Sequence, residues 1–331
     1  MKKTQKKRKY SVISLFSGCG GLDLGFLGDF TYLDKHYSKR KFEITWANDI
    51  DEPSCLTFKK NFNQDIVCGD INSILSNNVG NKLFGDVPLP KNVDIVFGGF
   101  PCQDFSLAGK RRGFASQRGT LYKAMADVID RVRPAMFVAE NVRGLLSMNN
   151  GEAIKKIESD FAALGYHIST HLYLAANYEV PQSRERVIIV GTDKKRNLPP
   201  FEHPKPILTK GDWITLKKAI GDLENKKEGE VANHYWSRAK MFFGTQGNST
   251  VSADKVGPTM RSEHHGNIEW HWNKKRRLSA REAARIQSFP DNFIFLPSTS
   301  SAYKQIGNAV PPVMAWHIAI AVEKFLDKHN I

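Results

Sequence analysis

Short apolar runs alternate with segments of helical period along the first 191 residues of the chain. The runs are rich in β-branched and aromatic residues, as buried strands are, whereas the segments between them repeat apolar residues every three or four positions. We expect strands at 11–16, 42–48, 66–68, 93–97, 135–139, 168–174 and 186–190, and helices at 53–61, 121–131 and 153–164. Strand and helix in alternation predict an α/β fold with a doubly wound, mostly parallel sheet.

The regular alternation ends after Gly191. Residues 192–276 are polar and weakly periodic, which indicates a separate small domain or a set of long loops. Helical period returns at 278–287 and 312–328, and we expect the last helix to return to the first domain. The segments 28–41 and 77–90 are predicted to be loops. The expected division is a basic tail at 1–10, a first domain at 11–191, a smaller domain at 192–276 and late helices at 277–331.

Composition and charge narrow the class of protein. The 331 residues are 41% hydrophobic, enough for a sizeable core. The net charge of +14 favours a polyanionic partner, although a generally basic surface would give the same value. No run of about eighteen apolar residues is present, so we expect no membrane span. The cysteines form no CxxC pair and have no histidine at ligand spacing, which favours reduced thiols in a cytoplasmic protein and no metal site.

A glycine-rich segment, Phe16-Ser17-Gly18-Cys19-Gly20-Gly21, follows the first expected strand. Glycines let the backbone approach a ligand and leave amide groups directed at it. Cofactors bind at this turn in doubly wound sheets. Asp49 ends the second strand and Asp70 follows the third. Carboxylates there suit the ribose and base of a nucleotide-like cofactor, but they equally suit helix N-caps or turns.

Cys102 follows Pro101 after the fourth expected strand. A single cysteine is more often a small buried hydrophobe than a nucleophile. Here the neighbouring motifs favour chemistry, because Glu140 ends the next strand, Arg184 precedes the last one and Arg186 begins it. A nucleophile, an acid and a guanidinium at one rim of the sheet predict an active site.

Taken in order, these segments resemble the motifs of the bacterial cytosine carbon-5 DNA methyltransferases of restriction-modification systems. The resemblance covers most of 11–191 and 278–320 and implies a Rossmann-like, S-adenosylmethionine-dependent methyltransferase fold with a target-recognition domain at 192–276. The similar segments are 16–21 (cofactor loop), 100–103 (catalytic loop), 140–142 (acid motif), 182–186 (arginine motif), and 281–290 and 305–310 (late motifs).

The resemblance also implies a mechanism. The thiolate of Cys102 would add to carbon 6 of cytosine, which makes carbon 5 nucleophilic toward the methyl group. Glu140 would contact ring nitrogen 3, and Arg186 would hold the base carbonyl oxygen with Arg184 nearby. Such charge-assisted contacts stabilise developing charge in a site without water. A base within a duplex must first be flipped out of the stack.

The cofactor residues implied by the resemblance include the whole glycine segment and the two carboxylates. Ile50 stands where relatives often have an aromatic residue that stacks on adenine, and Ala309 where they often have serine. Aliphatic packing by Ile50 can substitute for stacking. The implied set for S-adenosylmethionine is Phe16, Ser17, Gly18, Cys19, Gly20, Gly21, Asp49, Ile50, Asp70, Ile71, Pro101 and Asn308.

The resemblance implies DNA contacts in two places. The basic stretch 109–119 is similar to the family's mobile loop, although its composition also fits an ordinary solvated loop. Pro258-Thr259 resembles an element that holds the DNA backbone. The expected DNA-binding residues are Gln103, Ser106, Lys110, Arg111, Arg118, Thr259 and Arg261. Polar residues such as Asn233 and His234 suit base edges, and the cluster 274–277 suits phosphates. His264 and His265 are interpreted as loop residues rather than metal ligands.

Other functions stay open on sequence alone. A tRNA cytosine methyltransferase of the same fold is the nearest, but such relatives usually lack a recognition segment as long as 192–276. A nicotinamide-dependent oxidoreductase would give Cys102 and Glu140 no joint role, and a non-catalytic DNA-binding regulator would not need them. We therefore expect a monomeric enzyme that acts on double-stranded DNA beside a separate cognate restriction endonuclease. The target sequence and the base that removes the carbon-5 proton cannot be predicted.

Overall fold

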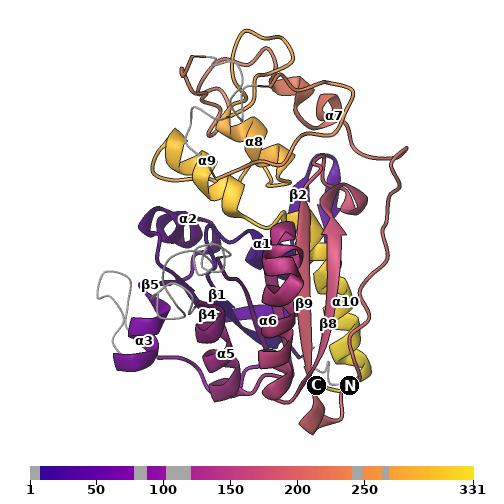
Figure 1. Ribbon diagram of the computed structural model, residues 1–331. Coiled ribbons are helices and arrows are strands. Elements are labelled where there is room, and N and C mark those ends of the chain that lie inside the picture. Colours follow the sequence, from indigo (N-terminus) through magenta and orange to yellow (C-terminus); the bar gives the residue numbers. More distant parts are fainter. Residues whose placement is uncertain (1–7, 78–87, 102–120, 241–248, 263–267) are drawn as a thin grey trace, which may run out of the picture.

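The computed structural model describes residues 8–77, 88–101, 121–240, 249–262 and 268–331, which form a larger and a smaller lobe (Figure 1). The larger lobe is built on a sheet of order β5-β4-β1-β6-β7-β9-β8. β9 runs antiparallel to both neighbours, whereas the pairs from β5 to β7 are parallel. The mostly parallel doubly wound sheet is confirmed. Its strands are β1 (Tyr10–Leu15), β4 (Phe42–Asp49), β5 (Val67–Cys68), β6 (Ile95–Gly99), β7 (Met136–Val142), β8 (Tyr166–Leu174) and β9 (Glu185–Asp193).

Helices cover both faces of this sheet because successive strand residues point to opposite sides. One face packs against α1 (Gly21–Leu27) and α10 (Pro312–Lys328), and the other against α5 (Leu121–Val132) and α6 (Glu152–Ala163). The first face buries Val12, Ile44, Phe97, Val138 and Ile188, and the second buries Ile13, Trp46, Val96, Phe137 and Ile189. α1 and α10 approach closely at Gly25, where a β-carbon would lie 2.3 Å from Ala315 Cβ.

Two further helices border the expected cofactor region. α2 (Glu52–Phe62) begins after Asp51, whose carboxylate accepts the N–H of Ser54, and Pro53 occupies its first turn. α3 (Ile71–Asn77) begins directly after Asp70. The 3-10 turns are η1 (Arg143–Leu146), η2 (Met148–Gly151), η3 (Ala175–Tyr178), η4 (Lys194–Arg196) and η5 (Gly221–Leu223).

The smaller lobe combines irregular chain with α7 (Leu216–Ile220), α8 (Ala280–Ile286) and α9 (Thr299–Asn308) (Figure 1). Within the described ranges its extended segments pair only through isolated bridges. One apolar cluster holds it together, and α8 and α9 share that cluster with the polar region before them. Members of the cluster include Leu216, Ile220, Met260, Ala283, Phe289 and Ile306.

The expectation of a loop at 28–41 is wrong. The segment forms a hairpin of β2 (Phe30–Tyr32) and β3 (Lys35–Tyr37). Phe30 and Tyr37 stack with ring centroids 5.1 Å apart, and the Tyr32 hydroxyl donates to the carbonyl of Arg285 at 2.7 Å. The aromatic residues of these short strands are thus buried. Most of the other expected loop, 78–87, lies outside the described residues.

One helical stretch, 299–328, is long and apolar enough to meet the composition test for a membrane span. It contains α9 and α10, and 67% of its most apolar window is buried inside the protein. α10 covers one face of the sheet against α1. The stretch is therefore explained as core helix.

Candidate active site

The ends of several strands meet at the rim that faces the smaller lobe (Figure 1). β1, β6 and β7 end at this rim, and β9 begins there because it runs antiparallel to β7. The chain order of the sheet reverses direction at β1, and ligands bind outside the strand ends at such a point. A ligand site is therefore expected at this rim.

Glu140 and Arg186 meet at this rim. Arg186 Nε lies 2.7 Å from Glu140 Oε1, and both side chains are nearly buried. The contact is an ion pair without an aligned hydrogen bond from that nitrogen. Burial lowers the pKa of Arg186, and the Glu140 carboxylate offsets part of this effect. The structure thus brings the predicted acid and one predicted guanidinium together.

Arg184 lies close to this pair but has different partners. Its side chain is fully buried. Its guanidinium donates to the carbonyls of Met260 at 2.7 Å, Gly307 at 2.7 Å and Ala309 at 3.1 Å. These carbonyls come from the smaller lobe and from the end of α9. Arg184 was expected near Arg186, and it lies there, but its Nη1 and Nη2 bind backbone carbonyls that link the two lobes.

The predicted nucleophile lies just outside the described residues, as do Gln103, Ser106, Lys110, Arg111 and Arg118. The chain leads to Cys102 from Phe100, which is buried, and from Pro101, which is exposed. Asn141 Nδ2 donates to the carbonyl of Phe100 at 2.9 Å. This bond ties the end of β6 to the β7 residue next to Glu140, so the segment entering the catalytic loop is fixed at the rim.

The glycine segment after β1 forms an open turn. Phe16 and Gly18 have positive φ angles of 52° and 55°. The amide of Ser17 donates to the carbonyl of Asn48 at 2.9 Å, and the amide of Gly18 to Asp49 Oδ2 at 2.7 Å. A β-carbon on Gly18 would meet no atom within 4 Å. This open space beside a backbone turn suits a bound small molecule.

Side chains at the ends of β4 and β5 border the same space. The Asp49 carboxylate also accepts the Asp51 amide at 2.8 Å, and burial raises its pKa. Ile50 is 69% exposed, and it offers an apolar surface to a ring. Asp70 Oδ1 accepts the Asn72 amide at 3.1 Å, so it also caps α3. The residues therefore fit a ribose and a purine.

Two predicted cofactor residues point their side chains away from the turn of the glycine segment. Cys19 is buried in the apolar cluster of the smaller lobe, and Ile71 in the cluster under α5 and α6. Only their backbone groups are available to a ligand in the turn. Burial strongly raises the pKa of the Cys19 thiol, so it stays protonated.

Asp23, in the first turn of α1, is a residue that sequence reasoning missed. It is fully buried, and in the described part of the chain neither carboxylate oxygen has an aligned hydrogen bond. Burial raises its pKa to about 7, and Asp49 adds to this effect. The sequence offered one signal for it, namely an acidic residue in the first helical turn after the glycine segment. A buried carboxylate at this end of the turn suits a cationic ligand.

Asn308 ends α9 and is exposed. Its neighbours pack against the glycine segment, since a β-carbon on Gly21 would lie 2.4 Å from the carbonyl oxygen of Val310 and 3.1 Å from Ala309 Cβ. The late motif therefore lies beside the predicted cofactor loop, although the two are nearly three hundred residues apart in the chain.

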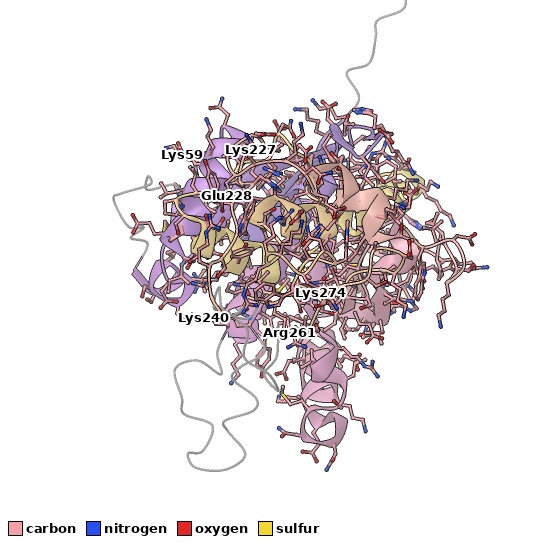
Figure 2. The ribbon with its side chains drawn as sticks, turned by 90° about the horizontal axis from the view of Figure 1, so that it is seen from above. Lys59, Lys227, Glu228, Lys240, Arg261 and Lys274 are labelled. Atoms are coloured by element: carbon pink, nitrogen blue, oxygen red, sulfur yellow. The ribbon has the colours of Figure 1, made fainter. Side chains whose placement is uncertain are left out.

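The Pro258-Thr259 element lies alongside the arginine motif. The amide of Ser183 donates to the Gly257 carbonyl at 2.8 Å, and Thr259 Oγ1 donates to the Ser183 carbonyl at 3.2 Å. Arg261 follows and is exposed. Figure 2 shows Arg261, Lys240 and Lys274 toward one side of the molecule, with Lys59 and Lys227 toward the other. The exposed cations on the first side suit a phosphate backbone.

Part of the expected DNA surface is buried. In the cluster 274–277 only the two lysines are exposed. Arg276 pairs with Glu282 at 2.6 Å, and Arg277 donates to the Ala239 carbonyl at 2.9 Å. His234 is buried and Asn233 is half-buried: the ring of His234 hydrogen-bonds to Ser279, and the Asn233 side chain binds the backbone of Phe295. These four residues were expected to face DNA, and that expectation is wrong because their donors hold the smaller lobe together. Glu263, His264, His265 and Asn267 lie outside the described residues.

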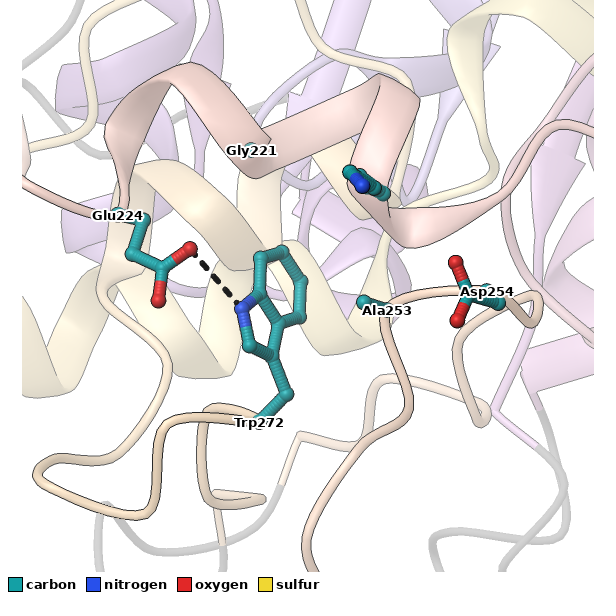
Figure 3. A pocket seen from close by; sticks show the side chains of 6 residues that line it. Gly221, Glu224, Ala253, Asp254 and Trp272 are labelled. Carbon is teal, nitrogen blue, oxygen red and sulfur yellow. Dashed lines mark hydrogen bonds between the residues drawn. The ribbon is translucent and has the colours of Figure 1, made fainter.

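A cavity of about 380 Å³ lies in the smaller lobe between α7 and two loops (Figure 3). Trp272 Nε1 donates to Glu224 at 3.0 Å along its wall. Its lining includes none of the rim residues, so it is separate from the predicted active site. Among the described residues no group of three or more metal-ligating side chains occurs.

Comparison with known proteins shows the family of the chain. The family model for C-5 cytosine-specific DNA methylases matches residues 10–253 and 233–324. The chain is 36% identical to the Type II methyltransferase M.NgoFVII of Neisseria gonorrhoeae, over 92% of this chain and 84% of that protein. It is also 36% identical to the Type II methyltransferase M.FnuDI of Fusobacterium nucleatum, over 97% of this chain and 96% of that protein.

Solved structures share the fold. A putative DNA modification methyltransferase from an Escherichia coli prophage has a TM-score of 0.68 at 22% identity, covering 96% of this chain and 100% of that chain. The Dnmt2 methyltransferase of Schizosaccharomyces pombe has a TM-score of 0.66 at 16% identity, covering 98% and 100%. The fold is that of the S-adenosylmethionine-dependent methyltransferases. The chain belongs to the C-5 cytosine-specific DNA methylase family, and its activity is that of a DNA (cytosine-5-)-methyltransferase.

Proposed function

We propose that this enzyme methylates carbon 5 of a cytosine flipped out of a specific duplex sequence, as the modification enzyme of a restriction-modification system. The relatives at 36% identity are Type II methyltransferases. A separate endonuclease would cut the same sequence when it is unmodified. The enzyme acts as a monomer in this proposal.

The observation that carries the proposal is the Glu140–Arg186 pair at the rim, next to the segment that leads into Cys102. Arg186 is held by one oxygen of the Glu140 carboxylate and by the Glu185 carbonyl, to which its Nη1 donates at 2.7 Å, and its Nη2 is left for the carbonyl oxygen of the base. Glu140 contacts ring nitrogen 3 as a proton donor. Both groups are nearly buried, so their interactions with a developing charge are stronger than in water.

In the proposed reaction the Cys102 thiolate forms a bond to carbon 6, and the electron pair moves to carbon 5. Carbon 5 then takes the methyl group that S-adenosylmethionine supplies when bound, and S-adenosylhomocysteine is the product. A base then takes the proton from carbon 5, the released electron pair re-forms the double bond between carbons 5 and 6, and the sulfur–carbon 6 bond breaks to restore the thiolate. Glu140 donates a proton to nitrogen 3 as charge develops there and takes it back when the thiolate leaves, while Arg186 donates to the carbonyl oxygen.

The methyl donor would occupy the open space at the glycine segment. The Gly18 turn and Asp49 suit the amino acid and ribose portions, and Ile50 and Asp70 suit the adenine. Cys19 and Ile71 would contribute backbone groups only. Asn308, on the adjacent end of α9, would close the side of the space.

Bisulfite sequencing of a plasmid from cells that express the protein tests this function. We expect protected cytosines at one position of one recurring short sequence, and none in cells that express Cys102→Ser. Labelled methyl transfer to purified duplex DNA and to tRNA identifies the substrate. Transfer to tRNA alone would overturn the proposed substrate, and protection by the serine variant would overturn the nucleophile.

A further inference from the structure

Gly99, the last residue of β6, packs directly against the Glu140 carboxylate. The two residues are partners in the parallel register of β6 and β7. A β-carbon on Gly99 would lie 2.6 Å from Glu140 Oε2, closer than a real β-carbon comes to an atom to which it is not bonded. The absence of a side chain at this position is therefore what allows the carboxylate its observed place.

The preceding glycine meets a different constraint. A β-carbon on Gly98 would lie 2.4 Å from the backbone oxygen of Leu15 in the neighbouring strand β1. Gly98 thus serves the packing of the sheet, whereas the contact of Gly99 is with a functional side chain. Gly99 is one of the last sheet residues before the catalytic loop.

The carboxylate has little freedom to move away from an added methyl group. Arg186 holds Oε1 at 2.7 Å on one side. The strand ends cannot separate easily, because Asn141 Nδ2 binds the Phe100 carbonyl at 2.9 Å. Among the described residues no hydrogen bond reaches Oε2, the oxygen that lies over Gly99. Oε2 is thus positioned by its packing against Gly99, and it can form a hydrogen bond with a ligand.

We propose that Gly99 is a positioning residue for the methyl transfer. Because Gly99 has no side chain, the Glu140 carboxylate packs directly against its Cα, and Oε2 faces ring nitrogen 3 of the flipped cytosine. This inference rests on the proposed function. A methyl group at residue 99 would displace the carboxylate by a fraction of an ångström to an ångström, and misplacement on that scale costs up to ~100-fold in rate.

The direct test is Gly99→Ala, with Gly144→Ala as the matched control. Gly144 lies in the turn after β7, where a β-carbon would meet only Val142 Cγ2 at 3.9 Å. We expect kcat of the Gly99 variant to fall about 10- to 100-fold, while its Kd for S-adenosylhomocysteine and its Tm stay close to those of the wild type. The Gly144 variant should retain wild-type kcat. An unchanged kcat in Gly99→Ala would overturn the inference.

A double-mutant cycle with Glu140→Gln separates positioning from general disruption. If Gly99 acts through Glu140, the alanine should cost less than about threefold when it is added to the Glu140→Gln variant, because the function it disturbs is already lost. Equal losses in both backgrounds would show that Gly99 is merely structural. If Glu140→Gln itself retains full activity, the proposed role of Glu140 fails, and that result is distinguishable from failure at Gly99.

Discussion

The two lobes of the molecule are held together in different ways. The larger lobe rests on a continuous ladder of strands, and its catalytic groups stand at the strand ends. The smaller lobe has no such ladder among its described residues, and buried arginines bind its irregular backbone. Arg281 alone donates to the carbonyls of Ala232, Pro290 and Phe293.

The two lobes hold their residues in place by different kinds of hydrogen bond. A ladder fixes Glu140 and Arg186 through backbone bonds that nearly any strand sequence provides. Arginines with several donors fix loops whose course no regular pattern sets. In the smaller lobe the exposed residues can therefore vary, because the buried arginines hold the backbone in place. We infer that chemistry depends on the first lobe and target choice on the second.

The largest expected effect comes from removing the chemistry without disturbing either lobe. Cys102→Ser should lower the methylation rate by at least ~10³-fold, because a hydroxyl is a far weaker nucleophile at neutral pH. The Kd for duplex DNA and the Tm should change little. Radiolabelled methyl transfer and a fluorescence binding assay measure the two. Retained turnover would refute the proposed nucleophile.

The next largest effect should come from a substitution that destabilises the smaller lobe alone. Arg281→Met would leave three backbone carbonyls without their buried donor, at a cost of about 3–5 kcal/mol in the free energy of unfolding. Duplex binding should be lost, while S-adenosylhomocysteine still binds the larger lobe. Arg238→Met is the control, since Arg238 is exposed and its pair with Glu228 should contribute little. Equal loss of both ligands would show that the lobes are not separable in this way.

A pH-dependent effect should arise in the larger lobe. Burial raises the pKa of Asp23 to about 7, so the folded protein binds a proton there that the unfolded chain releases above about pH 4. The free energy of unfolding should therefore fall as pH rises from about 4 to 7. Asp23→Asn should remove this slope and stabilise the ligand-free protein at pH 8 by on the order of 2–4 kcal/mol relative to pH 5. Urea unfolding at both values measures it, and an equal change at pH 5 and pH 8 would contradict it.

The smallest effect concerns the exposed face of the smaller lobe. Lys274→Ala should weaken duplex binding a few-fold and reduce the slope of log Kd against log salt by about 1, as expected for one lost phosphate contact. Lys227→Ala, toward the other side of the molecule (Figure 2), is the matched control. The assignment of this face to DNA would be contradicted if both variants changed the slope equally.

Much of the larger lobe could be predicted from the sequence, because strand residues alternate faces and the motifs stand at strand ends. The Glu140–Arg186 pair follows from that logic. The separate role of Arg184 could not be predicted, because its partners are carbonyls from residues far along the chain. The hairpin at 30–37 was missed because its strands are too short for a clear pattern.

The smaller lobe was predicted less well for a physical reason. In sequence, Lys274-Lys275-Arg276-Arg277 has the appearance of a surface cluster. Two of its members are buried because Glu282 and distant carbonyls are available to them in the fold. Burial of a charge depends on partners brought together by the whole chain, and a local pattern does not contain them.

The central claim is that Cys102 attacks carbon 6 of a cytosine at the rim beside Glu140 and Arg186. Duplex DNA with 5-fluorocytosine at the target position, incubated with S-adenosylmethionine, tests it most directly, because fluorine cannot leave carbon 5 as a proton does. We expect a covalent protein–DNA complex that survives denaturation, with the attachment mapped by mass spectrometry to Cys102. Methyl transfer without a covalent complex, or attachment at another residue, would contradict the account.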